Sequence, residues 1–142
     1  MSDCIFCKII AGEIPSEKVY EDEHVLAFLD IAPVNPGHTL VIPKTHSSDF
    51  LDTTESSLIV VVKVLPKIAK AIMWAVGADG FNIGVNNGAA AGQIVPHMHF
   101  HVIPRLSGDG YKSWGHRKYG EGEALKIAER IRTSVENSRT IN

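Results

Sequence analysis

The chain has 142 residues, 44% of them hydrophobic, which suffices for one compact domain around a single core. Its 14 basic and 16 acidic side chains leave a formal net charge of −2. Bulk binding of a polyanion needs an excess of basic residues, so we expect no nucleic acid and no membrane among its partners. A small anionic substrate would have to be held by local groups.

The location of the protein in the cell is predicted from its N-terminal residues, its most apolar segment and its cysteines. The N-terminal residues lack the basic stretch and apolar run of a secretory signal. The most apolar segment, residues 58–76, contains a proline and three lysines, which is too polar for a membrane span. Cys4 and Cys7 lie close together and are a poor basis for a secreted disulfide framework. We therefore expect a cytoplasmic protein.

The predicted elements are short strands and helices. The longest helix has Asp52 as its expected N-cap, with Glu55 three residues later, and ends at Gly77. Apolar residues at spacings of three and four, among them Val61 and Val62, predict its buried face. The other expected elements are a helical turn at 4–11, strands at 19–20, 24–29, 38–43, 81–86 and 97–103, and a last helix at 122–135.

Five strands joined mostly by short turns, with two main helices, predict an α+β fold with an antiparallel sheet. No repeat or long linker interrupts the sequence. We expect a single domain over residues 1–142, with its core at 4–105 and a C-terminal loop and helix at 106–142.

Histidines alternate with apolar residues in the last predicted strand, as His97, His99 and His101. Successive side chains of a strand point to opposite faces, so the imidazoles would share one face while Met98 and Phe100 enter the core. Three interpretations compete: exposed polar residues, ligands of a catalytic metal, and a nucleophile with its acid–base partners.

A loop of small residues at 88–92 favours the catalytic interpretation. Backbone N–H groups in a glycine-rich loop can approach a phosphate closely. A neutral imidazole can attack phosphorus and a protonated one can donate a proton. Because crowded imidazoles resist charging all at once, both forms are accessible near pH 7.

The run His97-Met98-His99-Phe100-His101-Val102-Ile103 matches the motif His-φ-His-φ-His-φ-φ, with φ apolar, and resembles the histidine triad (HIT) superfamily. Segments 4–10, 27–31 and 36–46 are similar to its Hint-type branch, especially the bacterial members that contain zinc. The resemblance implies a HIT-like fold with a five-stranded antiparallel sheet and two main helices. It also implies a homodimer with joined sheets, formed through residues 53–77 and 80–86.

The resemblance also implies roles for single residues. His99 would attack the α-phosphorus, His101 would bind a phosphate oxygen and assist the leaving group, and His38 and His97 would complete the catalytic set. Asp30 would bind the ribose hydroxyls. The base would lie among Ile5, Phe6, Ile9, Phe28 and Ile31, with Asn86 and Gln93 near the phosphate.

Each binding position also has an ordinary structural interpretation. Asp30 follows a predicted strand and could be a turn residue. The apolar residues would fill a core in almost any protein. Asn86 and Gln93 could satisfy the backbone of the glycine-rich turn. Many members have Ser or Thr after the glutamine, whereas this chain has Ile94, whose side chain cannot donate a hydrogen bond.

The cysteine pair has the spacing of half a zinc site. By the resemblance, Cys4, Cys7, His46 and His97 would hold a structural zinc ion in a closed tetrahedral site. The alternative is a pair of reduced cysteines that pack without metal. No catalytic metal is expected.

The resulting hypothesis is a HIT-type hydrolase or transferase that acts on the α-phosphate of purine nucleotide derivatives. Its substrates would be nucleoside phosphoramidates, acyl-adenylates or dinucleoside polyphosphates, cleaved through a covalent nucleotidyl-histidine to release the monophosphate. Two alternatives remain: a nucleotide-binding scaffold with vestigial hydrolysis, and a hydrolytic zinc centre built from the three histidines of the motif.

Overall fold

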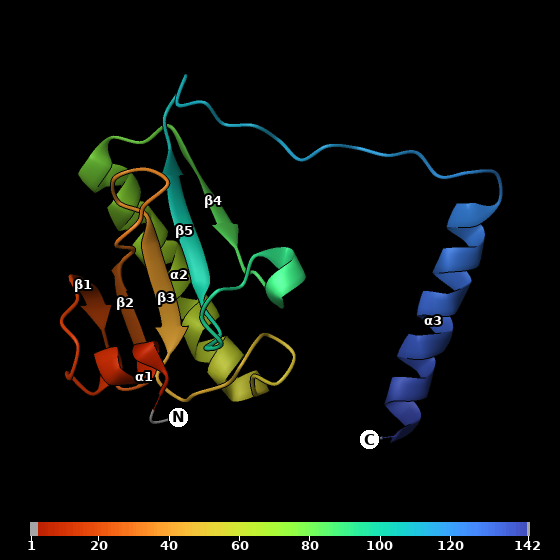
Figure 1. Cartoon of the computed structure of the whole chain (residues 1–142), viewed down its shortest axis with the longest axis horizontal. Helices are drawn as coiled ribbons and strands as arrows, with labels where there is room; N and C mark the ends of the chain where they lie inside the picture. Colours follow the sequence, from red (N-terminus) through yellow and green to blue (C-terminus); the bar gives the residue numbers. More distant parts are fainter. Residues whose placement is uncertain (1–2, 142) are drawn as a thin grey trace. The chain divides into compact units, whose positions relative to one another are not determined.

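The computed structural model describes residues 3–141, with side chains through residue 138. It comprises two compact units, residues 1–110 and 111–142 (Figure 1). The boundary lies close to the expected division between the core and the C-terminal loop and helix. The grouping of both parts into one domain stays a prediction.

The first unit is built on a five-stranded sheet in the order β1-β2-β3-β5-β4, and every neighbouring pair is antiparallel. The α+β fold with an antiparallel sheet is thereby confirmed. The strands are β1 (Lys18–Glu21), β2 (Val25–Leu29), β3 (Thr39–Pro43), β4 (Gly80–Gly84) and β5 (Phe100–Arg105).

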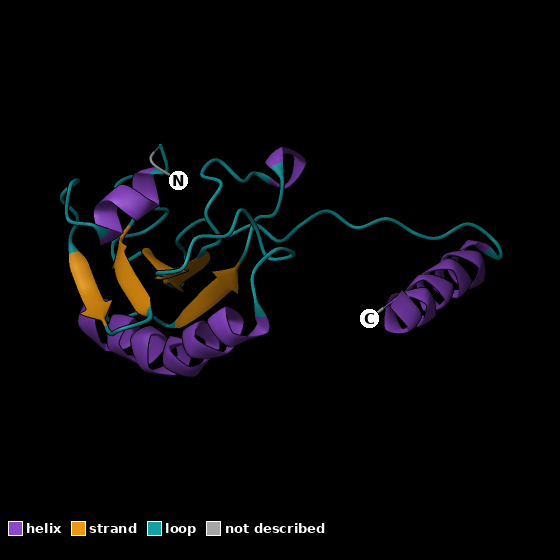
Figure 2. Ribbon diagram, turned by 90° about the horizontal axis from the view of Figure 1, so that it is seen from below, coloured by secondary structure: helices purple, strands orange, loops and turns teal. Residues whose placement is uncertain are grey.

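The sheet is covered by a helix on each face. Figure 2 shows the long helix α2 (Glu55–Val76) along one face and the short helix α1 (Ile5–Ile10) on the other. Alternate residues of β2 follow this division, since Ala27 packs with α2 and Phe28 packs with α1. Because both faces are covered, every residue of β3 is buried.

Helix α2 begins two residues later than expected. Thr54 is its N-cap and accepts a hydrogen bond from the backbone N–H of Ser57 (3.2 Å), so the prediction of Asp52 as the cap is wrong. The Asp52 carboxylate instead accepts from the N–H groups of Ser48 and Asp49, because it closes the preceding loop. The helix ends at Gly77, as expected, and Gly77 itself adopts a left-handed backbone conformation.

The buried face of α2 confirms most of the predicted periodicity. Val61, Leu65, Ile68, Ala69 and Ile72 are buried against the sheet. Val62 is an exception to the prediction, because it points away from the sheet and is 51% exposed.

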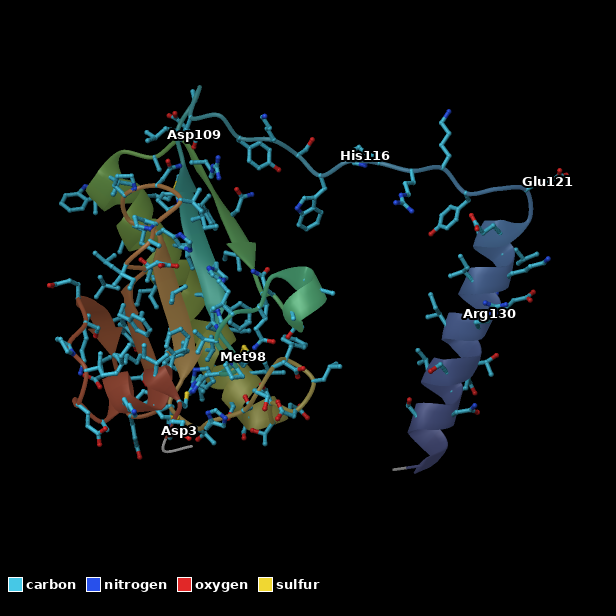
Figure 3. The ribbon with its side chains drawn as sticks, viewed as in Figure 1. Asp3, Met98, Asp109, His116, Glu121 and Arg130 are labelled. Carbon is cyan, nitrogen blue, oxygen red and sulfur yellow. The ribbon has the colours of Figure 1, made fainter. Side chains whose placement is uncertain are left out.

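The last strand begins at Phe100, three residues later than expected. The backbone before it bonds elsewhere, because the N–H of Met98 donates to the carbonyl oxygen of Ser47 (2.9 Å) rather than to a neighbouring strand. The predicted alternation nevertheless holds, since Met98 and Phe100 are both in the core. Met98 is labelled in Figure 3.

The second unit contains helix α3 (Glu123–Ile141), which extends six residues beyond the predicted end at residue 135. The residues from 111 to 120 form neither helix nor strand and are exposed. His116 lies in this segment (Figure 3). No helix among the described residues has both the length and the apolar character needed to cross a membrane.

Candidate active site and metal centre

Three imidazoles are brought together where β5 meets β3. His101 lies in β5 and pairs with Leu40, while His38 directly precedes β3. His38 Nε2 lies 2.9 Å from His101 Nδ1. The ring centroids of His99 and His101 are 4.9 Å apart, and the ring of Phe6 lies nearly perpendicular to that of His99, with centroids 5.2 Å apart. The cluster therefore joins residues far apart in sequence.

Backbone groups fix which nitrogen of each ring carries a proton. The N–H of Val34 donates to His38 Nδ1 (3.0 Å), so neutral His38 is protonated on Nε2 and donates to His101 Nδ1. His101 is then protonated on Nε2. His99 Nδ1 donates to the carbonyl oxygen of His97 (2.6 Å), which leaves a lone pair on His99 Nε2. His99 thus offers a lone pair on Nε2, and the neighbouring His101 offers a hydrogen-bond donor on its Nε2.

The environment keeps two of these rings neutral at pH 7. Burial lowers the pKa of His38, and the nearby Asp30 carboxylate opposes this shift. Burial, followed by the charges of His99 and His38, lowers the pKa of His101 to about 4. Asp30 is again the opposing charge, because it favours the protonated ring.

A cavity of about 430 Å³ opens beside the imidazoles. Its wall is mostly apolar, and Asp30, His99 and His101 lie on it. All five residues that the resemblance assigns to the base line this cavity: Ile5, Phe6, Ile9, Phe28 and Ile31. Ile14, Pro15, Ser16, Leu40 and Gly92, which the sequence did not single out, line it as well.

Asp30 accepts a hydrogen bond from the backbone of its own turn and also lines the cavity. Its Oδ1 accepts a hydrogen bond from the N–H of Ala32 (2.8 Å), as expected of a turn residue. Its Oδ2 lies 3.7 Å from His38 Nε2. A carboxylate has about four acceptor positions, so capacity remains for ligand hydroxyls.

The two predicted amide residues lie on either side of the glycine-rich loop and do not line the cavity. Gln93 accepts from the N–H of Gly88 (2.8 Å) and donates to the carbonyl oxygens of Ser48 and Val95, so its side chain holds the loop together. The Nδ2 atom of Asn86 lies close to Gly92. Ile94 lines the rim of the cavity and is 91% exposed.

A second cluster brings together the four predicted metal ligands, Cys4, Cys7, His46 and His97. His97 Nδ1 lies 3.4 Å from the sulfur of Cys4, 3.6 Å from that of Cys7 and 3.2 Å from His46 Nδ1. The sulfur of Cys7 lies 3.4 Å from His46 Nδ1. A tetrahedral zinc ion, with bonds of roughly 2.3 Å to sulfur and 2.0 Å to nitrogen, sets its ligand atoms roughly 3.3–3.8 Å apart, the shortest being between two nitrogens and the longest between two sulfurs. The donor set therefore fits zinc.

The orientation of His97 supports the same assignment. This ring is fully buried, and its Nε2 donates to the carbonyl oxygen of Pro43 (2.9 Å), which leaves the lone pair of Nδ1 toward the sulfurs. His97 does not line the cavity. Its side chain belongs to the cysteine cluster, and its carbonyl oxygen supports the catalytic cluster through His99.

The hydrolytic zinc centre from three histidines does not fit the structure. Among the described residues, the ligand atoms of His97, His99 and His101 do not form one close group, because His97 Nδ1 faces the cysteines. A second close group consists of Asp30, His38 and His101. In that group His38 Nε2 carries a proton and has no lone pair for a cation, because Val34 holds Nδ1 as an acceptor.

Comparison with known proteins settles the family. A model of the HIT domain matches residues 11–108. The chain belongs to the HIT family. It is 56% identical over 126 residues to an uncharacterized HIT-like protein of Methanocaldococcus jannaschii, covering 89% of this chain and 94% of that one. It is 48% identical over 108 residues to adenylylsulfatase HINT3 of Arabidopsis thaliana, covering 76% of this chain and 55% of that one.

Solved structures confirm the HIT fold. A Streptococcus mutans protein aligns with a TM-score of 0.89 and 46% identity, over 95% of this chain and 87% of that one. A zinc-bound histidine triad family protein of Mycobacterium smegmatis aligns with a TM-score of 0.74 and 40% identity, over 95% and 98%. A hypothetical histidine triad nucleotide-binding protein of Sulfolobus tokodaii has a TM-score of 0.72 and 43% identity, over 94% and 93%.

The lowered pKa of His101 predicts that this HIT protein loses stability in mild acid. The unfolded chain binds a proton at the ordinary histidine pKa of about 6.5, whereas the folded chain binds it only near 4. Stability is therefore retained above pH 6.5 and falls as the pH drops toward 4. Between pH 7 and 5 we expect His101 to account for a loss of about 2 kcal/mol in the free energy of unfolding.

Denaturant unfolding at pH 7, 6 and 5 measures this loss. The variant His101→Gln should show a shallower pH dependence than the unmodified chain, and His24→Gln, at an exposed site, serves as the matched control. Equal slopes for all three proteins would contradict the burial of His101 in its neutral form.

Proposed function

We propose that this HIT-family chain is a nucleotide hydrolase or transferase in which His99 forms a covalent bond to the α-phosphorus of a purine nucleotide. The observation that carries the proposal is the hydrogen bond from His99 Nδ1 to the carbonyl oxygen of His97. It leaves the lone pair of Nε2 for attack on phosphorus. The position of His99 on the wall of the cavity that Asp30 also lines supports the same role.

The proposed reaction has two steps. His99 Nε2 forms a bond to phosphorus, and the bond from phosphorus to the leaving group breaks with its electron pair on that group. An anionic phosphate raises the pKa of His101 when it binds, so His101 can hand a proton to the departing amine or nucleotide. Water then attacks phosphorus and gives a proton to His101, while the bond from phosphorus to His99 Nε2 breaks with its electron pair on nitrogen, so that both histidines are restored and the nucleoside monophosphate is released.

The rest of the cavity supports a nucleotide as the substrate. In this proposal Asp30 accepts hydrogen bonds from the ribose hydroxyls, and the apolar wall around Phe6 and Phe28 holds a purine base. One solved relative is described as nucleotide-binding, and another relative is named an adenylylsulfatase. Adenylyl sulfate therefore joins phosphoramidates, acyl-adenylates and dinucleoside polyphosphates as a candidate substrate.

The exposed Ile94 is the observation that favours a second candidate function, a nucleotide-binding scaffold with vestigial hydrolysis. Its aliphatic side chain lies at the rim of the cavity, and only its backbone N–H could donate to a leaving group. A scaffold would bind nucleotide without forming an adduct.

Turnover of adenosine 5′-phosphoramidate, adenylyl sulfate, an acyl-adenylate and diadenosine polyphosphates tests the proposal. We expect His99→Ala to lose at least about 1,000-fold in kcat/KM, because no other group replaces the nucleophile. Acid-quenched mass spectrometry should show one nucleotidyl group on the unmodified chain and none on this variant. The control His24→Ala should keep full turnover.

The scaffold gives a different result in the same experiment. Tight binding of adenosine monophosphate, with neither turnover nor adduct in the unmodified chain, would exclude the enzyme and favour the scaffold. Binding that survives in His99→Ala while turnover is lost would favour the enzyme.

The cysteine cluster is proposed to hold a structural zinc ion through Cys4, Cys7, His46 and His97. Such an ion would supply no catalytic step, because all four positions of a tetrahedral site are taken by protein ligands. It would tie α1 to the segment before β5. The alternative is reduced cysteines hydrogen-bonded to the imidazoles without metal.

Metal analysis of the purified chain tests the zinc proposal. We expect about one zinc per chain, and less than about a fifth of this in Cys7→Ser, because a hydroxyl is a poor zinc ligand. Removal of zinc by a chelator should lower the melting temperature. Ser113→Ala, in the exposed segment of the second unit, should keep its zinc. A zinc-free chain with unchanged melting in chelator would favour the metal-free cluster.

The homodimer is the third proposal, and the edge strand β4 supports it. β4 has a single neighbour in the sheet, and its Phe81 and Ile83 are 44% and 43% exposed. The other segment of the proposed interface, residues 53–77, carries the exposed apolar residues Ile59, Val62 and Trp74 on α2. Pairing of β4 with the same strand of a second copy would satisfy its free backbone groups.

Sedimentation of the full chain tests this proposal. We expect twice the chain mass of 15.5 kDa for the unmodified protein and the single mass for Ile83→Lys, because the new charge would be buried in the interface. Val19→Lys is the matched control, since Val19 is 50% exposed on β1 at the opposite edge. A monomeric unmodified chain, or a dimer that survives Ile83→Lys, would contradict this interface.

A further inference from the structure

The hydroxyl of Ser16 is unusual in this structure. Among the side chains described, Ser16 Oγ is the single buried polar atom without a hydrogen-bond partner. Leaving a buried hydroxyl unpaired is unfavourable, and such groups normally find a partner. Serine in a loop commonly bonds a nearby backbone group, but Ser16 does not. A ligand in the cavity that Ser16 lines would supply such a partner.

Ser16 lies on the wall of the cavity, which is also lined by Asp30, the side chain proposed to hold the ribose. β1 and β2 pair with Lys18 opposite Phe28, and the N–H of Leu29 donates to the carbonyl oxygen of Glu17 (3.0 Å). Extending this antiparallel register by two residues places Ser16 opposite Asp30. Because strand side chains alternate, both then lie on the face that carries Phe28 and the cavity.

The two residues differ in what they offer a ligand. The Asp30 carboxylate accepts hydrogen bonds only, whereas the Ser16 hydroxyl can donate. A single ligand hydroxyl between them could donate to Asp30 and accept from Ser16. Rotation about the Cα–Cβ bond of Ser16 would turn its oxygen toward the cavity, and no existing hydrogen bond would be lost.

We propose that Ser16 is a specificity-determining residue that hydrogen-bonds the ribose 2′-hydroxyl and so selects ribonucleotides over 2′-deoxyribonucleotides. This inference rests on the proposed function, in which Asp30 holds the ribose. We choose the 2′-hydroxyl because it is the ribose hydroxyl nearer to the base, since C2′ adjoins the carbon that carries the base. Ser16 directly follows Ile14 and Pro15, which line the cavity whose apolar wall is proposed to hold the base.

The test is calorimetric binding of three ligands to the full chain: adenosine 5′-monophosphate and its 2′-deoxy and 3′-deoxy analogues. Ser16→Ala should weaken binding of the first and of the 3′-deoxy analogue by about 3- to 10-fold, the value of one neutral hydrogen bond. Binding of the 2′-deoxy analogue should not change. Ser113→Ala, in the exposed segment of the second unit, should leave all three affinities as they are.

A second measurement separates this role from a structural one. If Ser16 supports the fold, its replacement by alanine should lower the melting temperature of the ligand-free chain. We expect no decrease, because an unpaired hydroxyl is removed from a buried position. A clear decrease would overturn the inference.

The outcomes also separate this inference from the function on which it rests. If the unmodified chain binds none of the three ligands, the proposed function fails and this inference fails with it. If it binds adenosine monophosphate but Ser16→Ala weakens all three ligands equally, or none of them, only the role of Ser16 is overturned.

Discussion

The hydrogen bond from His99 Nδ1 to the carbonyl oxygen of His97 connects the two centres of this protein. On one side of it, the ring of His97 is fixed by Pro43 and the cysteine cluster. On the other side, it decides which nitrogen of His99 keeps a lone pair. Met98 anchors the peptide between them in the core. The geometry proposed for catalysis thus depends on the packing of Met98 and on the cysteine cluster next to it in the chain.

The sheet supplies the second constraint, because both of its faces are covered. β3 lies at its centre, so the loop before this strand must hold His38 against His101. Gly37 makes this possible, since it adopts a positive φ of 97° and its Cα lies so close to α2 that an added Cβ would be 2.9 Å from Val76. A side chain there would push the His38 loop away from the helix.

Helix α1 is too short to be stable alone, since it has six residues. It is held at its start by the sulfur of Cys4, which accepts a hydrogen bond from the N–H of Cys7 (3.4 Å). Phe6 holds it further through T-shaped contacts with Phe28 and His99. The same helix lines the cavity with Ile5 and Ile9. The cysteine cluster therefore supports the wall of the proposed nucleotide site as well as His97.

The order of the residues is enough to predict the resemblance to the HIT family, the antiparallel α+β fold and the burial of Met98 and Phe100, because each follows from local periodicity or from a motif in neighbouring residues. The four residues proposed to hold zinc follow from that resemblance. Three features arise only when the chain is folded: His97 turns to the cysteines, Val34 and the carbonyl of His97 fix the protons of His38 and His99, and the hydroxyl of Ser16 is buried at the cavity wall without a partner. These depend on backbone groups distant in sequence or on strand register, and residue types alone do not encode either.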